Sequence, residues 1–213
     1  MGKKRLEKAI ALYQKVIPGG SADVFNVTWL PYYLDSTLPK VGVDRTAHLE
    51  KKYGAERVGM IQSRLTVMGK SEGIEFSLHG KVGNTRDAHR LIQLGKTKSN
   101  EVQNRIVTEL FKSHFEEDGD VTSHSMLTEA AVKAGLDRDE VKEWLEKGRG
   151  GNDVDIEAQR ALENGVRGVP SFTINGKYQV DGAQDVEYFM NTFMEARGPV
   201  ADTISNPTQG VSC

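Results

Sequence analysis

Residues 168–184 constrain the fold of this chain more than any other stretch of its sequence. They contain two short alternating runs, 171–174 and 177–180, separated by Asn175-Gly176. An Asn-Gly pair between such runs is the strongest local signal for a two-residue β-hairpin turn. Pro170 stands immediately before the first run, where a missing N–H costs least and where the preceding peptide bond can be cis. The stretch therefore predicts a hairpin that starts at a proline.

A helix is predicted directly after this hairpin, because apolar residues recur there at helical spacing. They are Val186, Phe189, Met190 and Phe193. Together with the hairpin, they define a unit that runs proline, strand, turn, strand, helix.

The rest of the chain is predicted to be mainly helical. A helix over 3–16 has one apolar stripe and stops at Pro18-Gly19-Gly20, and a strand is expected over 23–29. Between residues 44 and 163 the periodicity indicates about seven helical segments and no convincing strand. Asn84 or Thr85 is expected to cap one of these helices at its N-terminus.

Composition narrows the class of protein. The 213 residues carry a net charge of −2, which gives no electrostatic footprint for nucleic acid or an anionic membrane. We interpret the one basic cluster, Lys3-Lys4-Arg5, as a solvated helix face. No apolar run approaches the ~20 residues of a membrane span, and no signal-peptide core is present, so the expected location is cytoplasmic. Cys213 is the only cysteine, which excludes an intramolecular disulfide.

The block 168–184 resembles the DsbA-like family of thioredoxin-fold proteins, in particular its FrnE-type branch. Residues 27–34, 84–91 and 110–115 are similar to further blocks of that family in the same order. The resemblance implies an α/β, thioredoxin-like (DsbA-like) fold with a large all-helical insertion. The implied parts are an incomplete N-terminal half (1–40), a helical insertion (41–150), a C-terminal half (151–197) and a disordered tail (198–213).

The resemblance also implies a feature that this sequence lacks. Family members carry a first β-strand that ends in Cys-x-x-Cys, or a serine variant, just before a helix similar to residues 2–9. We therefore expect the first strand and the redox motif to be missing here, with the motif located just before Gly2, and no catalytic residue within the chain. Two interpretations stay open, an incomplete version of a longer protein and a shortened, redox-inactive protein.

Several residues become site candidates through the resemblance. Gly168, Val169 and Pro170 form the loop that binds substrate in the family, where the backbone of the residue before the proline pairs with an extended peptide. Asn84, His89 and Trp29 are candidates for a substrate pocket. Each of these three residues also has a purely structural interpretation. Asn84 would cap a helix, His89 would pack against neighbouring helices, and Trp29 would belong to the core. The five histidines show no metal-ligand spacing, so no metal site is predicted.

Two classes of function follow. The first is a thiol–disulfide oxidoreductase of the FrnE type or, within the same class, a glutathione-dependent 2-hydroxychromene-2-carboxylate isomerase-like enzyme with serine at the redox position. The second is a redox-inactive, thioredoxin-like protein that binds peptides. The expected partner is an extended peptide or a small-molecule thiol or disulfide. No cofactor is expected, apart from glutathione as a co-substrate of the isomerase type.

Overall fold

A computed structural model describes residues 1–198. The tail predicted for 198–213 and Cys213 therefore lie outside the described residues, apart from Gly198 itself. The helices are α1 (Gly2–Val16), α2 (Arg45–Tyr53), α3 (Ala55–Ser71), α4 (Arg86–Lys98), α5 (Asn100–Glu116), α6 (His124–Lys133), α7 (Arg138–Glu146), α8 (Gly151–Glu163) and α9 (Val186–Arg197), with a 3-10 turn at Gly20–Ala22. The strands are β1 (Val43–Asp44), β2 (Lys81–Val82), β3 (Ser171–Ile174) and β4 (Tyr178–Asp181).

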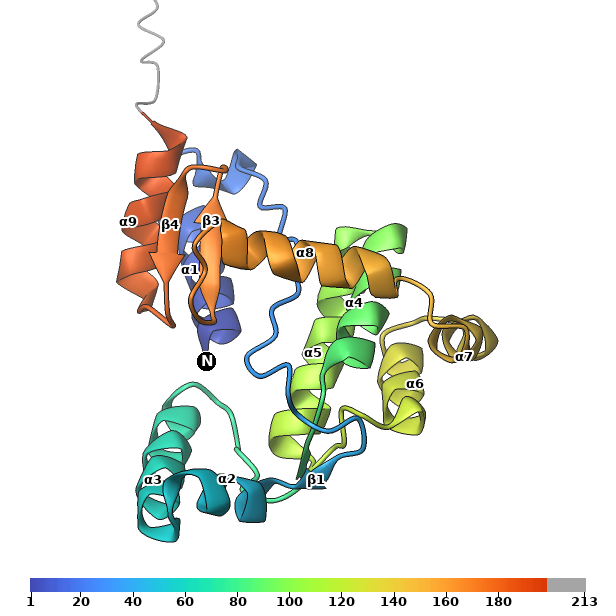
Figure 1. Ribbon diagram of the computed structural model, residues 1–213. Coiled ribbons are helices and arrows are strands. Elements are labelled where there is room, and N and C mark those ends of the chain that lie inside the picture. Colours follow the sequence, from blue (N-terminus) through green and yellow to red (C-terminus); the bar gives the residue numbers. More distant parts are fainter. Residues whose placement is uncertain (199–213) are drawn as a thin grey trace, which may run out of the picture.

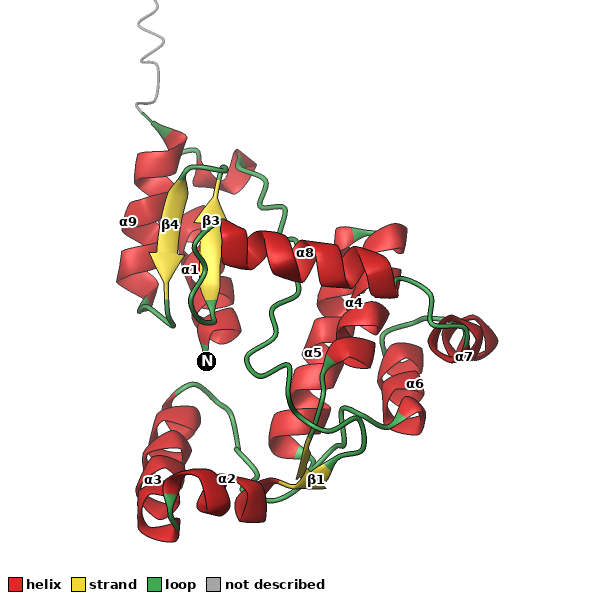
Figure 2. Cartoon of the chain, in the orientation of Figure 1, coloured by secondary structure: helices red, strands yellow, loops and turns green. Residues whose placement is uncertain are grey.

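These elements form two groups joined by a helix. Figure 1 shows α1, β3, β4 and α9 gathered at one end, α4 to α7 at the other, and α8 between them. The α2–α3 hairpin stands apart near the N-terminus of α1. Helices make up most of the regular structure (Figure 2).

The predicted hairpin is confirmed with one shift. β3 pairs antiparallel with β4, so that Ser171 lies opposite Asp181 and Ile174 opposite Tyr178. Asn175 and Gly176 both have positive φ, 50° and 67°, as a tight primed turn requires. The second strand begins at Tyr178, one residue later than predicted, because the turn leaves residue 177 outside the ladder.

The strand predicted over 23–29 is wrong. Residues 23–30 are extended and their side chains alternate between half-buried and exposed. Within the described residues, however, no backbone group of 24–30 bonds to another backbone group. The N–H and C=O of Trp29 pair instead with the side-chain amide of Gln103, at 2.9 Å each. A strand requires a ladder partner, and no described strand pairs with this segment.

The region between residues 44 and 163 also differs in one detail from the prediction. It contains the seven helices α2 to α8, in agreement with the periodicity. A short antiparallel pair joins β1, at the start of this region, to β2, which lies between α3 and α4, with Val43 opposite Val82. Two-residue strands are too short to show alternation, which is why the sequence did not indicate them.

Two hydrophobic clusters hold the structure together. The first joins α4 to α7 around Leu91, Ile106 and Leu127, all with no exposed surface. Gly95 lets α4 and α5 approach closely, since a Cβ there would lie 2.5 Å from the Cδ1 atom of Ile106. The second cluster lies between α1, α9 and the hairpin and consists of Leu6, Ala9, Tyr13, Val180, Phe189 and Phe193.

Local capping fixes the ends of several helices. Thr85 is the N-cap residue of α4 and makes no side-chain cap bond. Asn84 Oδ1 accepts the backbone N–H of Arg86 at 2.9 Å, so Asn84 forms an Asx turn that leads into the helix. Asp137 accepts the N–H groups of residues 139 and 140 at the start of α7, and Gly135 before it has φ 95°, as a left-handed helix end requires. Among residues 1–198, no helix combines the length and apolar character needed to cross a bilayer.

Candidate functional site

The most distinctive local geometry lies at the start of β3. The Val169–Pro170 peptide bond is cis, and the C=O of Pro170 accepts the N–H of Gly182 at 2.8 Å. Val169 remains 47% exposed. Within residues 1–198, neither its N–H nor its C=O has a hydrogen-bond partner. The loop therefore presents a free backbone donor and acceptor at its surface.

The first turn of α1 lies directly against this loop. A Cβ built on Gly2 would be 2.8 Å from Pro170 Cγ and 3.3 Å from Phe172 Cζ. Only glycine fits at this position without displacing the proline ring. The loop and the N-terminus of α1 thus form one contiguous site.

The basic cluster Lys3-Lys4-Arg5 belongs to the same turn, and no acidic residue accompanies it there. The interpretation of this cluster as a solvated face is wrong for Lys3 and Arg5, because their side chains are only 10% and 21% exposed. Lys3 pairs with Glu7, and Arg5 reaches Glu72 at 2.6 Å. Because these two cations already pair with carboxylates, it is the N–H groups of the first helical turn that favour an anion at this end of α1.

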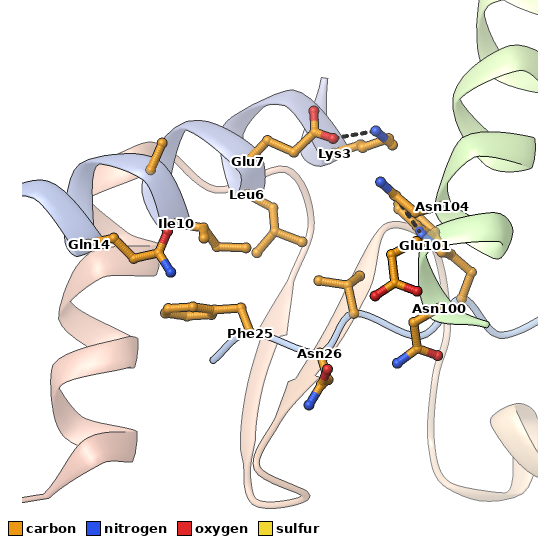
Figure 3. A pocket seen from close by; sticks show the side chains of 13 residues that line it. Lys3, Leu6, Glu7, Ile10, Gln14, Phe25, Asn26, Asn100, Glu101 and Asn104 are labelled. Atoms are coloured by element: carbon orange, nitrogen blue, oxygen red, sulfur yellow. Dashed lines mark hydrogen bonds and ion pairs between the residues drawn. The ribbon is translucent and has the colours of Figure 1, made fainter. Parts of the chain in front are cut away.

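A groove of about 290 Å³ runs alongside α1. Figure 3 shows Leu6 and Ile10 of α1 directed toward Phe25 of the extended segment, with polar side chains at the rim. Val27 and Trp29 complete the apolar wall. The groove therefore separates α1 from the segment that lacks a strand partner.

Trp29 lies at this groove, away from the loop itself. Its indole N–H donates to Asn104 Oδ1 at 3.2 Å, and its ring meets the ring of Phe111 edge-on, with 5.9 Å between centroids. These contacts fix the side chain as a half-buried wall of the groove.

Asn84 lies just before α4, and His89 lies on this helix. His89 Nδ1 is 2.8 Å from the C=O of Thr85, and its ring packs edge-on against Tyr33. Burial lowers the pKa of His89, so its imidazole is neutral near pH 7. In the described part of the chain, no hydrogen bond or aromatic contact connects Asn84 or His89 to residues 168–170.

The structure thus brings Pro170 against the first turn of α1, with Gly168 and Val169 adjacent to it in the same loop, and leaves the other candidates in separate surroundings. Gly2, Arg5 and Gly182 were missed by sequence reasoning. The small residue at the first position of α1 and the Gly-Ala-Gln sequence after β4 were the available signals. Among residues 1–198, no group of three or more His, Cys, Asp or Glu is arranged to hold a metal ion.

A cis-proline at the start of a hairpin, packed against the N-terminus of a long helix, defines a thioredoxin-like protein. Residues 1–193 match the DSBA-like thioredoxin domain family, and the chain belongs to that family. It adopts a mostly helical DsbA-like thioredoxin fold with few, short strands.

Solved structures include a similar protein, a probable DsbA oxidoreductase from Streptomyces coelicolor. It is 27% identical to this chain, with a TM-score of 0.81, and the similarity covers 99% of this chain and 87% of that one. No curated protein sequence matches the chain significantly.

Proposed function

We propose that residues 168–170 form the substrate-binding half of a thiol–disulfide oxidoreductase site of the FrnE type. The observation that carries this proposal is the unpaired backbone of Val169, exposed next to the N-terminus of α1. An extended peptide recognises such a backbone by adding as a strand, with main-chain hydrogen bonds supplying affinity. Val169 would donate and accept these bonds, while Pro170 holds the loop against Gly2.

The redox-active residue, in this proposal, lies on a strand that precedes α1 and is outside the 213 residues. Two stretches of backbone that leave an edge without a backbone partner within residues 1–198 support a strand at this position. In this described part of the chain, the backbone of 24–30 has no backbone partner, and β3 is paired on one edge only. A strand between them would cover Leu6 and Ile10 and end beside Gly2. A thiol there would have a lowered pKa, because the N–H groups at the helix N-terminus favour the thiolate.

The intact mass and peptide map of the protein purified from its own cells test this part. A mass above 23.5 kDa, with Cys-x-x-Cys before Gly2, is the expected result. A serine at that position would favour the glutathione-dependent isomerase type. A mass equal to that of the 213 residues would favour a redox-inactive peptide-binding protein, an alternative supported by the single cysteine of this sequence.

The variant Val169→Glu tests the binding half of the proposal. The new carboxylate must lose water when a peptide pairs with the loop, so we expect about tenfold weaker binding. The probe is a fluorescein-labelled octapeptide of alternating valine and serine, and the readout is fluorescence anisotropy.

The matched control is Val16→Glu, at the far end of α1, because Val16 is 51% exposed and Val169 47%. The control should bind the peptide as the wild type does. Equal affinity of the wild type and Val169→Glu would remove the loop from the binding site.

A further inference from the structure

Arg5 makes two charge-assisted contacts that lead to different parts of the molecule. Its Nε donates to Glu72 Oε1 and its Nη1 to the C=O of Ala183, both at 2.6 Å. The side chains of Arg5 and Glu72 are only 21% and 11% exposed. The guanidinium is therefore held in one place between two segments that are distant in sequence, one at Glu72 and one at Ala183.

The contact with Ala183 leads to the candidate site. Ala183 lies in the turn between β4 and α9, and the preceding Gly182, with φ 78°, donates its N–H to the C=O of Pro170 at 2.8 Å. Gln184 closes the same turn, because its side-chain amide donates to the C=O of Asp181 at 2.8 Å. Arg5 thus fastens the turn that holds the far side of the Val169–Pro170 loop.

The contact with Glu72 leads to the α2–α3 hairpin. Glu72 follows α3 directly and also accepts from Lys8 Nζ at 2.8 Å. Among the helices and strands of residues 1–198, α3 packs against α2 alone, and Figure 1 shows this hairpin apart from the other elements. Glu72 therefore ties the end of α3 to the first turns of α1, whereas α2 is held by β1, β2 and the bond from Arg45 to the C=O of His114 in α5.

We propose that Arg5 is a positioning residue that couples the α2–α3 hairpin to the Val169–Pro170 loop. Its bond to the C=O of Ala183 holds the turn behind Pro170 in place. Its ion pair with Glu72 makes the position of the guanidinium depend on the position of the hairpin. Guanidinium donors point in a fixed planar fork, so arginine serves both partners at once, which a lysine ammonium on a flexible stem does not. This inference rests on the proposed function, since the coupling matters only if the loop binds a peptide.

Arg5→Lys tests the coupling while keeping the charge. We expect binding of the valine–serine octapeptide to weaken about fivefold, which corresponds to the net contribution of one ordinary hydrogen bond. The amide resonances of Gly182 and Ala183 should move in the free protein. Lys8→Gln is the control, because Lys8 touches the same carboxylate but is half exposed, and it should change neither quantity.

A double-mutant cycle separates coupling from simple loss of packing. Glu72→Gln alone should weaken the peptide about twofold, and this effect should disappear in the Arg5→Lys background, because the path then no longer reaches Ala183. Additive effects, or an Arg5→Lys protein with wild-type affinity and unmoved resonances of residues 182 and 183, would overturn the inference.

Failure of the proposed function has a different signature. In that case the wild-type protein does not bind the octapeptide. The resonances of Gly182 and Ala183 would still show whether Arg5 sets the turn, and the coupling to binding would be overturned together with the proposed function.

Discussion

Replacing Arg90 by methionine is expected to lower the free energy of unfolding by about 3–5 kcal/mol, the range for removing one member of a buried, bonded ionic group. Arg90 is 2% exposed. Its guanidinium donates to the C=O groups of Trp144, Leu145 and Arg149 at 2.6, 3.1 and 2.8 Å, and to Asp87 at 2.6 Å. Trp144 and Leu145 lie in the last turn of α7, and their C=O groups also accept the N–H groups of residues 149 and 148. Methionine would therefore remove one partner from each of these two carbonyls, and it would break the bonds to the C=O of Arg149 and to the Asp87 carboxylate.

Urea unfolding measures this loss, and Arg138→Met is the matched control. Arg138 pairs with Glu129 at the surface, where both side chains are more than 40% exposed, and exposed pairs contribute little. We expect the control to unfold near the wild-type midpoint. A similarly small change for Arg90→Met would mean that the end of α7 finds other partners.

Acidification is expected to destabilise the protein through His114. Burial, followed by the nearby Arg45 guanidinium, lowers the pKa of His114 to about 4. Arg45 Nη2 lies 3.3 Å from His114 Nδ1. An unfolded histidine has a pKa of about 6.5, so the unfolded chain takes up this proton first as the pH falls. The stabilisation is complete above pH ~6.5 and is lost between pH ~6.5 and ~4, by about 2–3 kcal/mol.

The comparison that isolates this effect is the difference in unfolding free energy between pH 7 and pH 4.5 for wild type and His114→Gln. The variant should lose most of the expected pH dependence. His79→Gln, at an exposed position, should retain it. Equal pH dependence in wild type and His114→Gln would show that other groups are responsible, such as the half-buried His89, whose pKa is also lowered by burial.

The parts of the fold that the sequence predicts are those with a local cause. Asn175-Gly176 has a chemical preference for positive φ, so the hairpin position follows from two residues. Asp137 caps α7 in the same local way. The helices between residues 44 and 163 follow from apolar periodicity, because an amphipathic helix buries one stripe against its neighbours.

The parts of the fold that were not predicted correctly depend on partners that are distant in sequence. The alternating residues 23–30 have the pattern of a strand, but a ladder needs a neighbour, and here the side chain of Gln103 satisfies Trp29 instead. β1 and β2 are paired by a contact between residues almost forty positions apart. Neither outcome is encoded in a local window.

The candidate site shows the same division. The cis-proline loop was predicted from its own residues through the family resemblance, whereas the neighbouring roles of Gly2 and Arg5 arise from contacts across the fold. Arg90 belonged to the same sequence block as His89, yet its bonds go to the end of α7. A block of sequence can therefore resemble a site and still serve packing.

Amide hydrogen exchange at Val169 tests the central claim most directly. The N–H of Val169 has no partner within residues 1–198, so it should exchange rapidly in the free protein. If an extended peptide pairs with this backbone, saturating octapeptide should slow its exchange by about tenfold or more. Unchanged exchange at Val169, under conditions where anisotropy shows the peptide fully bound, would contradict the assignment of this loop as the substrate-binding half of the site.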